Sequence, residues 1–283
     1  MTERKTAVVT GASAGIGKAA ARELLDRGWR VIGVGRDAAR CAAAVAELNH
    51  PRFTMLRGDM ALLAETARVA EEIKALTARL DALLNNAGGV TAELTMTAEG
   101  NEATFAGNHL ATFLLTAKLM PLLQATARGP SAGPVRIVGT SSDAHSYCPG
   151  IAWDDPTFAQ NYTAGAAYCQ AKLANVLFTR ELARRVAGDR IVANVIHPGP
   201  VTSNFWSHGD EAFQNRIDSI RDQAVTPEQA AATLVWLADA PEAAEFNGQY
   251  FDKGTPADPA PVGQDDAAAA RLWELSERLV AGC

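Results

Sequence analysis

Cysteine is scarce in this chain, and its four cysteines lie far apart. Cys41, Cys148, Cys169 and Cys283 form no CxxC pair, and none has a partner at the spacing of a metal site. Disulfide scaffolds and zinc sites need paired or closely spaced cysteines. The sequence therefore predicts no metal site, and it favours a reduced, cytoplasmic environment.

The chain also lacks an excess of positive charge and a long apolar run. It has 26 basic and 32 acidic residues, for a formal charge of −6. Nucleic acids and anionic membranes attract basic surfaces, so neither is expected as the main partner. No apolar run reaches the roughly 18 residues of a membrane span, and the start MTERKTAVVTG has no features of a signal peptide. We expect one globular domain over residues 1–283.

The sequence does contain a regular alternation of short apolar strands with helices. Strands are predicted at 6–10, 30–34, 53–58, 81–85, 134–140, 190–198 and 247–251. Helices are predicted at about 15–27, 37–48, 101–127 with an interruption near Pro121, 165–187, from Thr226 onward, and about 265–281. This alternation predicts an α/β fold, a parallel sheet covered by helices on both faces. Ligands of such sheets bind beyond the carboxyl ends of the strands, so the residues that follow each strand are candidate site residues.

A glycine-rich loop follows the first strand. Residues 10–17 read TGASAGIG, and a helix is predicted to start at Gly15. Glycines allow a tight turn and a close backbone approach, and the helix N-terminus offers free N–H groups and a partial positive charge. A glycine loop alone is weak evidence, but its place after the first strand favours a pyrophosphate site.

The second strand ends at Gly35-Arg36-Asp37, where a dinucleotide fold faces the adenosine ribose. An acidic residue there would bind a free 2′-hydroxyl, whereas an arginine suits a 2′-phosphate. Gly35 stands where the acid is expected, and Arg36 follows. Asp37 could cap the next helix or could serve NAD. The charge at this strand end favours NADP over NAD.

Polar or small residues follow the other strands as well. Asp59-Met60 is placed to accept a hydrogen bond from an adenine amino group, although Asp59 could equally cap a helix. Residues 85–88, NNAG, suit the approach of a flat ligand. Ser141-Ser142 could be turn residues, and 197–203, HPGPVTS, form a rigid turn in which His197 is interpreted as structural.

Tyr168 and Lys172 lie four residues apart in the run YCQAK, within the predicted helix 165–187. On an α-helix this spacing places both side chains on one face, one turn apart. The pair occurs often by chance. It becomes informative only because the strand ends supply a nucleotide site beside it.

These motifs, TGASAGIG, NNAG, the Ser-Ser pair, YCQAK and HPGPV, stand in the order of the short-chain dehydrogenase/reductase family, which the whole chain resembles. It is most similar to the retinol-dehydrogenase-like branch, through GNHLATFLLT (107–116), SSDAH (141–145), AYCQAKLANVLFTRELARR, NGQYF and RLWELSE. The resemblance implies a Rossmann-type, doubly wound, mostly parallel seven-stranded sheet of order 3-2-1-4-5-6-7.

The resemblance also implies a catalytic set of Asn108, Ser142, Tyr168 and Lys172. Tyr168 would be the general acid or base, and Lys172 would favour its phenolate and hold the nicotinamide ribose. Ser142, the second serine of its pair, would donate to the alkoxide. Asn108 would hold a water for proton relay, although by itself it could be a helix kink or a buried hydrogen bond.

The resemblance, together with the residues at the strand ends, places the cofactor at a larger set of positions. The expected cofactor contacts are Gly11, Ser13, Ala14, Gly15, Ile16, Gly17, Arg36, Asp59, Met60, Asn86, Ala87, Gly88, Tyr168, Lys172, Pro198, Gly199, Val201 and Ser203.

We therefore expect an NADP(H)-dependent oxidoreductase that interconverts a carbonyl and an alcohol of a lipophilic small molecule. Residues 203–225 would form a lid, and the insert at 146–165 would border the substrate. One alternative is a non-catalytic NADP(H)-binding redox sensor or scaffold on the same fold; another is an epimerase or dehydratase, which usually needs a longer substrate domain. The helices at 101–127 and 165–187 could pair two subunits into a homodimer or homotetramer, or could simply cover the sheet.

Overall fold

Short β-branched and apolar segments pair side by side to form one sheet in the structure, a computed structural model that describes residues 4–129, 133–160, 162–202 and 209–283. Its described strands, in sheet order, are β3 (Phe53–Arg57), β2 (Arg30–Gly35), β1 (Thr6–Thr10), β4 (Ala82–Asn85), β5 (Val135–Thr140), β6 (Ile191–His197), β7 (Tyr250–Asp252) and β8 (Thr255–Ala257). Strands β1 to β7 pair in parallel, in the predicted order. The α/β Rossmann-type class is therefore confirmed.

The strand count differs from the prediction by one, because β8 pairs antiparallel with β7 at the edge of the sheet. A two-residue turn, Lys253-Gly254, joins them, and both residues have positive φ, 48° and 90°. This is the backbone pattern of a hairpin turn whose twist matches the strands. The sequence predicted a loop here because β8 reads Thr-Pro-Ala, and proline is tolerated in a strand only at a sheet edge or a bulge.

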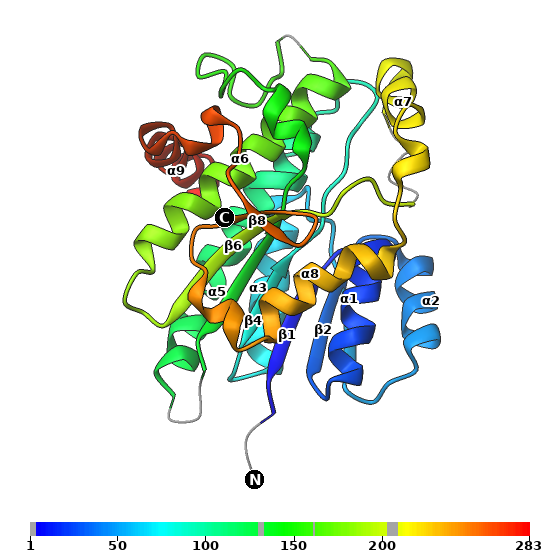
Figure 1. Cartoon of the computed structure of the whole chain (residues 1–283), viewed down its shortest axis with the longest axis vertical. Coiled ribbons are helices and arrows are strands. Elements are labelled where there is room, and N and C mark those ends of the chain that lie inside the picture. The colour runs from blue at the N-terminus through cyan, green and yellow to red at the C-terminus, as the bar shows by residue number, and fades with distance from the viewer. Residues whose placement is uncertain (1–3, 130–132, 161, 203–208) are drawn as a thin grey trace.

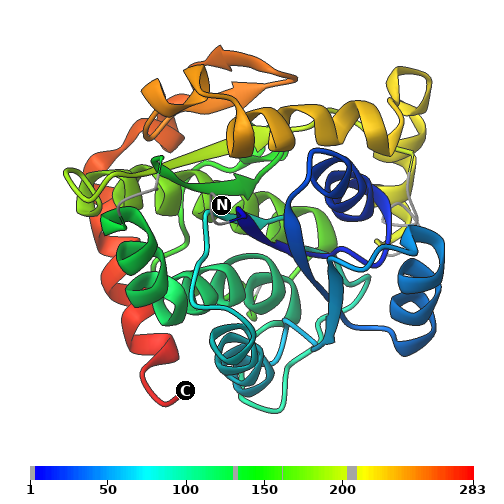
Figure 2. The ribbon, with the colours of Figure 1, turned by 90° about the horizontal axis from the view of Figure 1, so that it is seen from below.

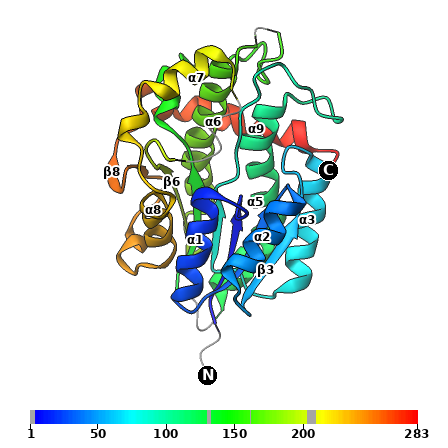
Figure 3. The same cartoon turned by 90° about the vertical axis from the view of Figure 1, so that its right-hand side faces the viewer.

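Helices cover both faces of the sheet (Figure 2). One face carries α1 (Gly15–Asp26), α2 (Ala38–Leu48) and α8 (Pro227–Asp239). The opposite face carries α3 (Leu63–Leu76), α5 (Ala111–Arg128) and α6 (Ala164–Arg185). Two hydrophobic cores fill the spaces between the sheet and each layer. Figure 3 shows α1 and α8 on one side of the sheet and α3 and α5 on the other.

The last helix, α9 (Asp266–Val280), packs on α6. Trp273 stacks on Phe178 with ring centroids 5.7 Å apart, and the Arg185 guanidinium lies over the indole. A buried hydrogen bond of 2.8 Å joins His109 Nε2 and Ser276 Oγ. The helices at 101–127 and 165–187 were suggested by the sequence as possible contacts between subunits. Part of their apolar surface is therefore covered by α9 of the same chain.

The long apolar helix before β5 differs in detail from its prediction. It starts as α4 (Ala103–Phe105), widens into a π-helical turn, η1 (Ala106–Leu110), and continues as α5 through Pro121. The predicted interruption near Pro121 is therefore wrong, and the irregularity lies at Asn108 instead. By length and mean hydropathy, 1.3, the segment Ala103–Arg128 could cross a membrane, but 61% of that apolar window is buried inside the fold, as in a core helix.

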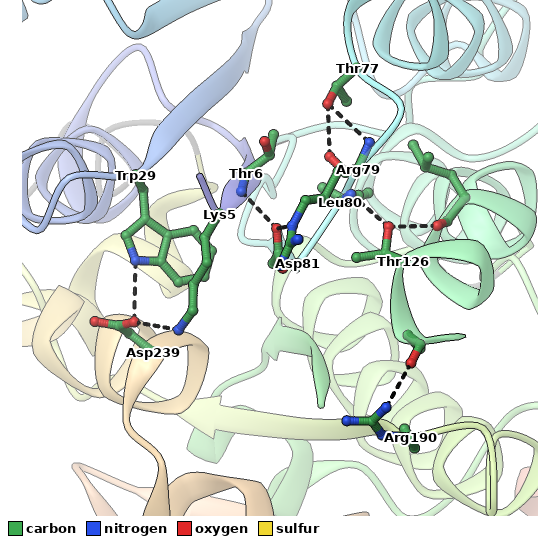
Figure 4. Close-up of polar contacts among 12 residues, drawn as sticks. Lys5, Thr6, Trp29, Thr77, Arg79, Leu80, Asp81, Thr126, Arg190 and Asp239 are labelled. Atoms are coloured by element: carbon green, nitrogen blue, oxygen red, sulfur yellow. Dashed lines mark hydrogen bonds and ion pairs between the residues drawn. The ribbon is translucent and has the colours of Figure 1, made fainter. Parts of the chain in front are cut away.

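Polar contacts fix the edge of the sheet at which the strands begin (Figure 4). The Asp81 carboxylate accepts from the Thr6 amide at 2.8 Å and pairs with Arg79 at 2.6 Å. Asp239, at the end of α8, accepts from Trp29 Nε1 at 3.2 Å and from Lys5 Nζ at 3.1 Å. In Figure 1 the strands run upward from this edge, and α7 (Glu211–Asp218) lies beyond their carboxyl ends.

Candidate active site

Tyr168 and Lys172 share one face of α6, as their spacing predicts. Lys172 Nζ lies 5.4 Å from the centroid of the Tyr168 ring and donates to the Thr140 carbonyl, at the end of β5, at 3.2 Å. The lysine is buried, and burial lowers the pKa of its ammonium to about 8. An ammonium that is costly to bury is stabilised by any electron-rich or anionic group placed beside it.

The two serines after β5 have different partners. Ser141 is buried, and its hydroxyl donates to the Lys172 carbonyl at 2.7 Å. Ser142 acts on the Tyr168 phenol by lowering its pKa, and its hydroxyl donates to the Asp143 carboxylate at 3.0 Å. The structure thus brings Ser142 to the phenol and gives Ser141 a position under α6.

The Tyr168 phenol is more firmly protonated than the sequence suggested. Burial raises its pKa above the ordinary value, and the hydrogen bond with Ser142 lowers it only in part. Desolvation of the phenolate is the largest cause of this shift, and Lys172, whose Nζ lies 5.4 Å from the ring centroid, is not among its causes. The phenol is therefore a proton donor at neutral pH. Phe213 of α7 packs edge-on against its ring at a centroid distance of 5.7 Å.

Asn108 lies in the π-helical turn η1, and its side chain approaches Gly88 near Lys172. Its Nδ2 donates to the Gly89 and Thr104 carbonyls, both at 2.7 Å. Its buried Oδ1 has no hydrogen-bond partner among the described residues. A β-carbon built at Gly88 would stand 2.5 Å from this oxygen and 3.2 Å from Lys172 Nζ, so Asn108 and Lys172 converge on Gly88. An orphaned buried acceptor beside an ammonium suits a water or a ligand hydroxyl.

The glycine loop is built for close approach. A β-carbon at Gly17 would lie 2.5 Å from the Gly11 carbonyl oxygen, so a larger residue would force the loop open. No side chain caps α1 at Ala14, and its first turn holds no acidic residue. The first N–H groups of α1 are therefore available to an anion such as a pyrophosphate. This observation fits a dinucleotide, with Ser13, Gly15 and Ile16 on the same loop.

Asn86 and Thr10 lock the NNAG loop to the glycine loop. Thr10 Oγ1 accepts from the Asn86 and Ala87 amides, both at 2.9 Å, and Asn86 Nδ2 donates to the Thr10 carbonyl at 2.9 Å. The Asn86 side chain is thus occupied within the protein and holds the backbone of Ala87 and Gly88 in place. The sequence analysis assigned no role to Thr10, although its position directly before Gly11 of the glycine loop could have indicated one.

The residues after β2 separate the two interpretations of Asp37. Its carboxylate accepts from the Arg40 amide at 2.8 Å and so caps α2. A side chain at Gly35 would meet Ser13, with a β-carbon only 2.9 Å from Ser13 Cβ. Arg36 has a 64% exposed side chain, with Asp59 Oδ2 3.9 Å from its guanidinium. Among these side chains Arg36 is the most exposed charge, since the Asp37 side chain is 46% exposed and Asp59 35%.

Asp59 and Met60 occupy the turn after β3. Asp59 Oδ1 accepts from the Ala61 amide at 3.1 Å, so Asp59 holds a turn and does not cap α3. The cap comes from Glu99, whose carboxylate accepts from the Leu63 and Ala64 amides at 2.8 Å each. Met60 is buried in the core beside Thr66. The predicted cap was therefore wrong, whereas an adenine contact stays a prediction.

The turn after β6 has the expected form where it is described. Gly199 has φ 84°, and Val201 forms a parallel bridge with Val225. The bridge uses the N–H groups of Thr202 and Val225, so neither of its hydrogen bonds occupies the N–H of Val201, which follows Pro198-Gly199-Pro200. Ser203, and the first part of the predicted lid, lie outside the described residues.

The insert between Ser142 and Tyr168 forms, together with α6, an apolar cavity of about 450 Å³ that is open to solvent on one side. Its lining consists of Tyr147, Cys148, Pro149, Gly150, Ile151, Ala152, Phe158, Ala166 and Cys169. Gln170, in the middle of YCQAK, is buried and holds the insert: its Oε1 accepts from the Ala152 amide at 2.7 Å, and its Nε2 donates to the Pro156 carbonyl at 2.8 Å. Sequence reasoning missed Gln170. Among the described residues, no group of three or more His, Cys, Asp or Glu could hold a metal ion.

Comparison with known proteins agrees with this geometry. The family model described as short chain dehydrogenase matches residues 5–212. The chain is 39% identical over 287 residues to human retinol dehydrogenase 13, covering 98% of this chain and 84% of the relative. It is 36% identical over 293 residues to mouse retinol dehydrogenase 14, covering 98% and 86%.

Two solved structures resemble the whole fold. A crystal structure of an uncharacterized protein from Mycobacterium paratuberculosis has a TM-score of 0.74 and 30% identity, covering 98% of this chain and 93% of that one. An NADP active-site complex of RhlG from Pseudomonas aeruginosa has a TM-score of 0.70 and 28% identity, covering 88% and 94%.

Proposed function

The chain belongs to the short chain dehydrogenase family, in its retinol-dehydrogenase-like branch, and on that premise we propose that it interconverts a carbonyl and an alcohol of a lipophilic small molecule with NADP(H). It is an oxidoreductase of a family that uses a nicotinamide cofactor. The observation that carries the proposal is the convergence of four side chains. Ser142 acts on the Tyr168 phenol by lowering its pKa, and Lys172 lies one turn along. The Oδ1 of Asn108, which has no partner among the described residues, faces the lysine across Gly88.

The proposed chemistry divides the work between cofactor and protein. When bound, the nicotinamide supplies or accepts the hydride. Tyr168 donates a proton to the substrate oxygen in reduction and accepts it in oxidation. Ser142 donates a hydrogen bond to that oxygen as it gains negative charge. Lys172 holds a ribose hydroxyl and stabilises the phenolate, and Asn108 Oδ1 holds the water through which Lys172 returns the proton.

The preference for NADP is supported by the residues after β2. Arg36 offers a guanidinium to a 2′-phosphate, a pairing that is charge-assisted and can be bidentate. Asp37 is committed to the cap of α2, and a side chain at Gly35 would collide with Ser13. The Oδ1 of Asp37 is thus occupied by the α2 cap, and Arg36 is the more exposed charge at this strand end.

A lipophilic substrate is supported by the cavity under the insert. The cavity is lined mainly by apolar side chains and two thiols, and Cys169 follows Tyr168 directly. Two polar side chains near in sequence to the lining have partners within the insert: Gln170 binds the insert backbone, and the Asp155 carboxylate accepts from the Ala159 and Gln160 amides at 2.8 Å each. Binding of a ligand in such a cavity is driven mainly by the burial of apolar surface.

The test is to measure turnover with a panel of aldehydes and ketones by monitoring the loss of NADPH absorbance. We expect steady oxidation of NADPH with at least one apolar carbonyl, and faster turnover with NADPH than with NADH. A protein that binds NADPH tightly yet oxidises it with no member of the panel would instead be a redox sensor or scaffold.

A further inference from the structure

Two histidines hold the peptide group that joins Ser142 to Asp143. His145 Nδ1 lies 2.7 Å from the Ser142 carbonyl oxygen. The Asp143 N–H, the other end of the same peptide group, donates to His197 Nδ1 at 3.1 Å. His145 lies in the short helix η2 (Asp143–Tyr147), and His197 is the last residue of β6. The peptide next to the serine is therefore held from one side by a ring of the short helix η2 and from the other by a ring at the end of strand β6.

The partners of each ring determine where its proton sits. A carbonyl oxygen only accepts, so His145 carries its hydrogen on Nδ1, and its Nε2 accepts from the Ala260 amide at 3.0 Å. A backbone amide only donates, so His197 Nδ1 carries no hydrogen, and the hydrogen lies on Nε2. Both rings are neutral, in opposite tautomers, and a second proton on either ring would place two donors face to face.

The surroundings of the two rings maintain this state. Both are buried, and burial lowers the pKa of each imidazolium. The carboxylates of Asp143 and Asp252 lie 4.0 Å from the two nitrogens of His197 and oppose the shift, whereas Lys253 adds to it. The Tyr250 ring packs on His145 at 5.0 Å. Both histidines line a cavity of about 320 Å³, which gives protons a route to the rings.

We propose that His145 and His197 are positioning residues that fix the peptide after Ser142 and so aim the Ser142 hydroxyl at Tyr168 and the substrate oxygen. The proposal rests on the proposed function and adds two residues to it. Orientation by a supporting shell matters because a reacting group displaced by about 1 Å can lose roughly 100-fold in rate. A role in folding alone would leave turnover per folded molecule unchanged.

A pair of substitutions at His197 separates positioning from simple packing. His197→Leu removes the acceptor, whereas His197→Asn places an amide oxygen near the position of Nδ1 and cannot titrate. We expect His197→Leu to lower kcat roughly 10- to 100-fold, with the KM for NADPH nearly unchanged, and His197→Asn to restore most of the loss. The proposal is overturned if folded His197→Leu keeps the wild-type kcat, or if His197→Asn is as slow as His197→Leu.

His50 supplies a matched control. Its Nδ1 also accepts a backbone N–H, from Arg52 at 3.1 Å, in the loop between α2 and β3. His50→Leu removes the same kind of hydrogen bond away from Ser142, so we expect its kcat to match the wild type. An equal loss in His50→Leu and His197→Leu would show a general effect on the fold and would overturn the positioning role.

A measurement without turnover tests the same geometry. Nitrogen NMR of the imidazole rings in the wild-type protein near neutral pH should show His197 as the Nε2–H tautomer and His145 as the Nδ1–H tautomer. An imidazolium at either residue, or the same tautomer at both, would contradict the hydrogen-bond pattern. If the wild type reduces no carbonyl, the proposed function fails, and this spectrum still decides whether the two rings hold the peptide.

Discussion

The Oδ1 of Asn108, unpaired within the described part of the chain, and the α-carbon of Gly88 face each other so closely that a β-carbon at position 88 would stand 2.5 Å from that oxygen. Gly88→Ala should therefore push Asn108 away from Lys172 and disturb the proton path. We expect kcat to fall roughly 10-fold or more, because the displaced groups no longer converge on one point. Steady-state kinetics of the purified variant measure the loss.

The neighbouring glycine provides the control for this substitution. A β-carbon at Gly89 would meet no other atom within 4 Å. Gly89→Ala should keep the wild-type kcat. If both alanine variants turn over equally fast, Asn108 and Gly88 have no part in the chemistry.

Arg36→Ala tests the cofactor preference. Loss of a charge-assisted contact to a 2′-phosphate should raise the KM for NADPH roughly tenfold, while the KM for NADH changes little. Asp37→Asn leaves an oxygen for the α2 cap and should change the ratio of the two KM values much less. Equal effects of Arg36→Ala on NADPH and NADH would remove the argument for NADP.

The cavity under the insert predicts a preference for long apolar substrates. Ala166 and Cys169 line it from α6, and Ala166→Phe should fill part of it. We expect the variant to raise the KM for decanal about tenfold or more and to leave the KM for propanal unchanged. A parallel loss with both aldehydes would mean that the cavity does not receive the substrate chain.

Acid should destabilise the fold through its buried histidines. Burial lowers the pKa of His109 to about 3 in the folded state, against about 6.5 in an unfolded chain. The unfolded chain therefore binds more protons, and the stabilisation present above pH 6.5 is lost as the pH falls toward the folded value. Between about pH 6.5 and 5 this one group removes up to about 2 kcal/mol of unfolding free energy.

His109→Gln isolates this contribution. Glutamine can keep a hydrogen bond to Ser276 Oγ, the partner of His109 Nε2, but it cannot titrate. Urea denaturation at several pH values should give a shallower pH dependence for the variant over the same window. An unchanged slope would show that His109 is not the source. The lowered pKa values of His145 and His197 act in the same direction in both proteins.

The sheet could be read from the sequence because its signals are local. Each of the first strands is a short run of buried apolar residues, and a glycine turn or a capped helix follows it. The edge strand β8 gave no such signal, because it depends on Lys253 adopting a left-handed backbone conformation, with φ 48°. That conformation is uncommon for lysine and is set by the pairing with β7.

Parts of the site were harder to predict, because they depend on contacts between distant residues. Glu99 caps a helix that begins 36 positions before it, so the local candidate Asp59 was chosen instead. His197 meets the Asp143 amide across 54 positions, and no spacing rule links them. Tyr168 and Lys172 were found because one helical turn brings them together.

Tyr168→Phe gives the most direct test of the account. The substitution removes the proton donor and keeps the ring that packs against Phe213. Turnover of the best carbonyl substrate should fall at least about 100-fold, while the dissociation constant for NADPH, measured by fluorescence titration, stays close to that of the wild type. Full turnover in this variant would contradict the assignment of Tyr168 as the acid and, with it, the proposed chemistry.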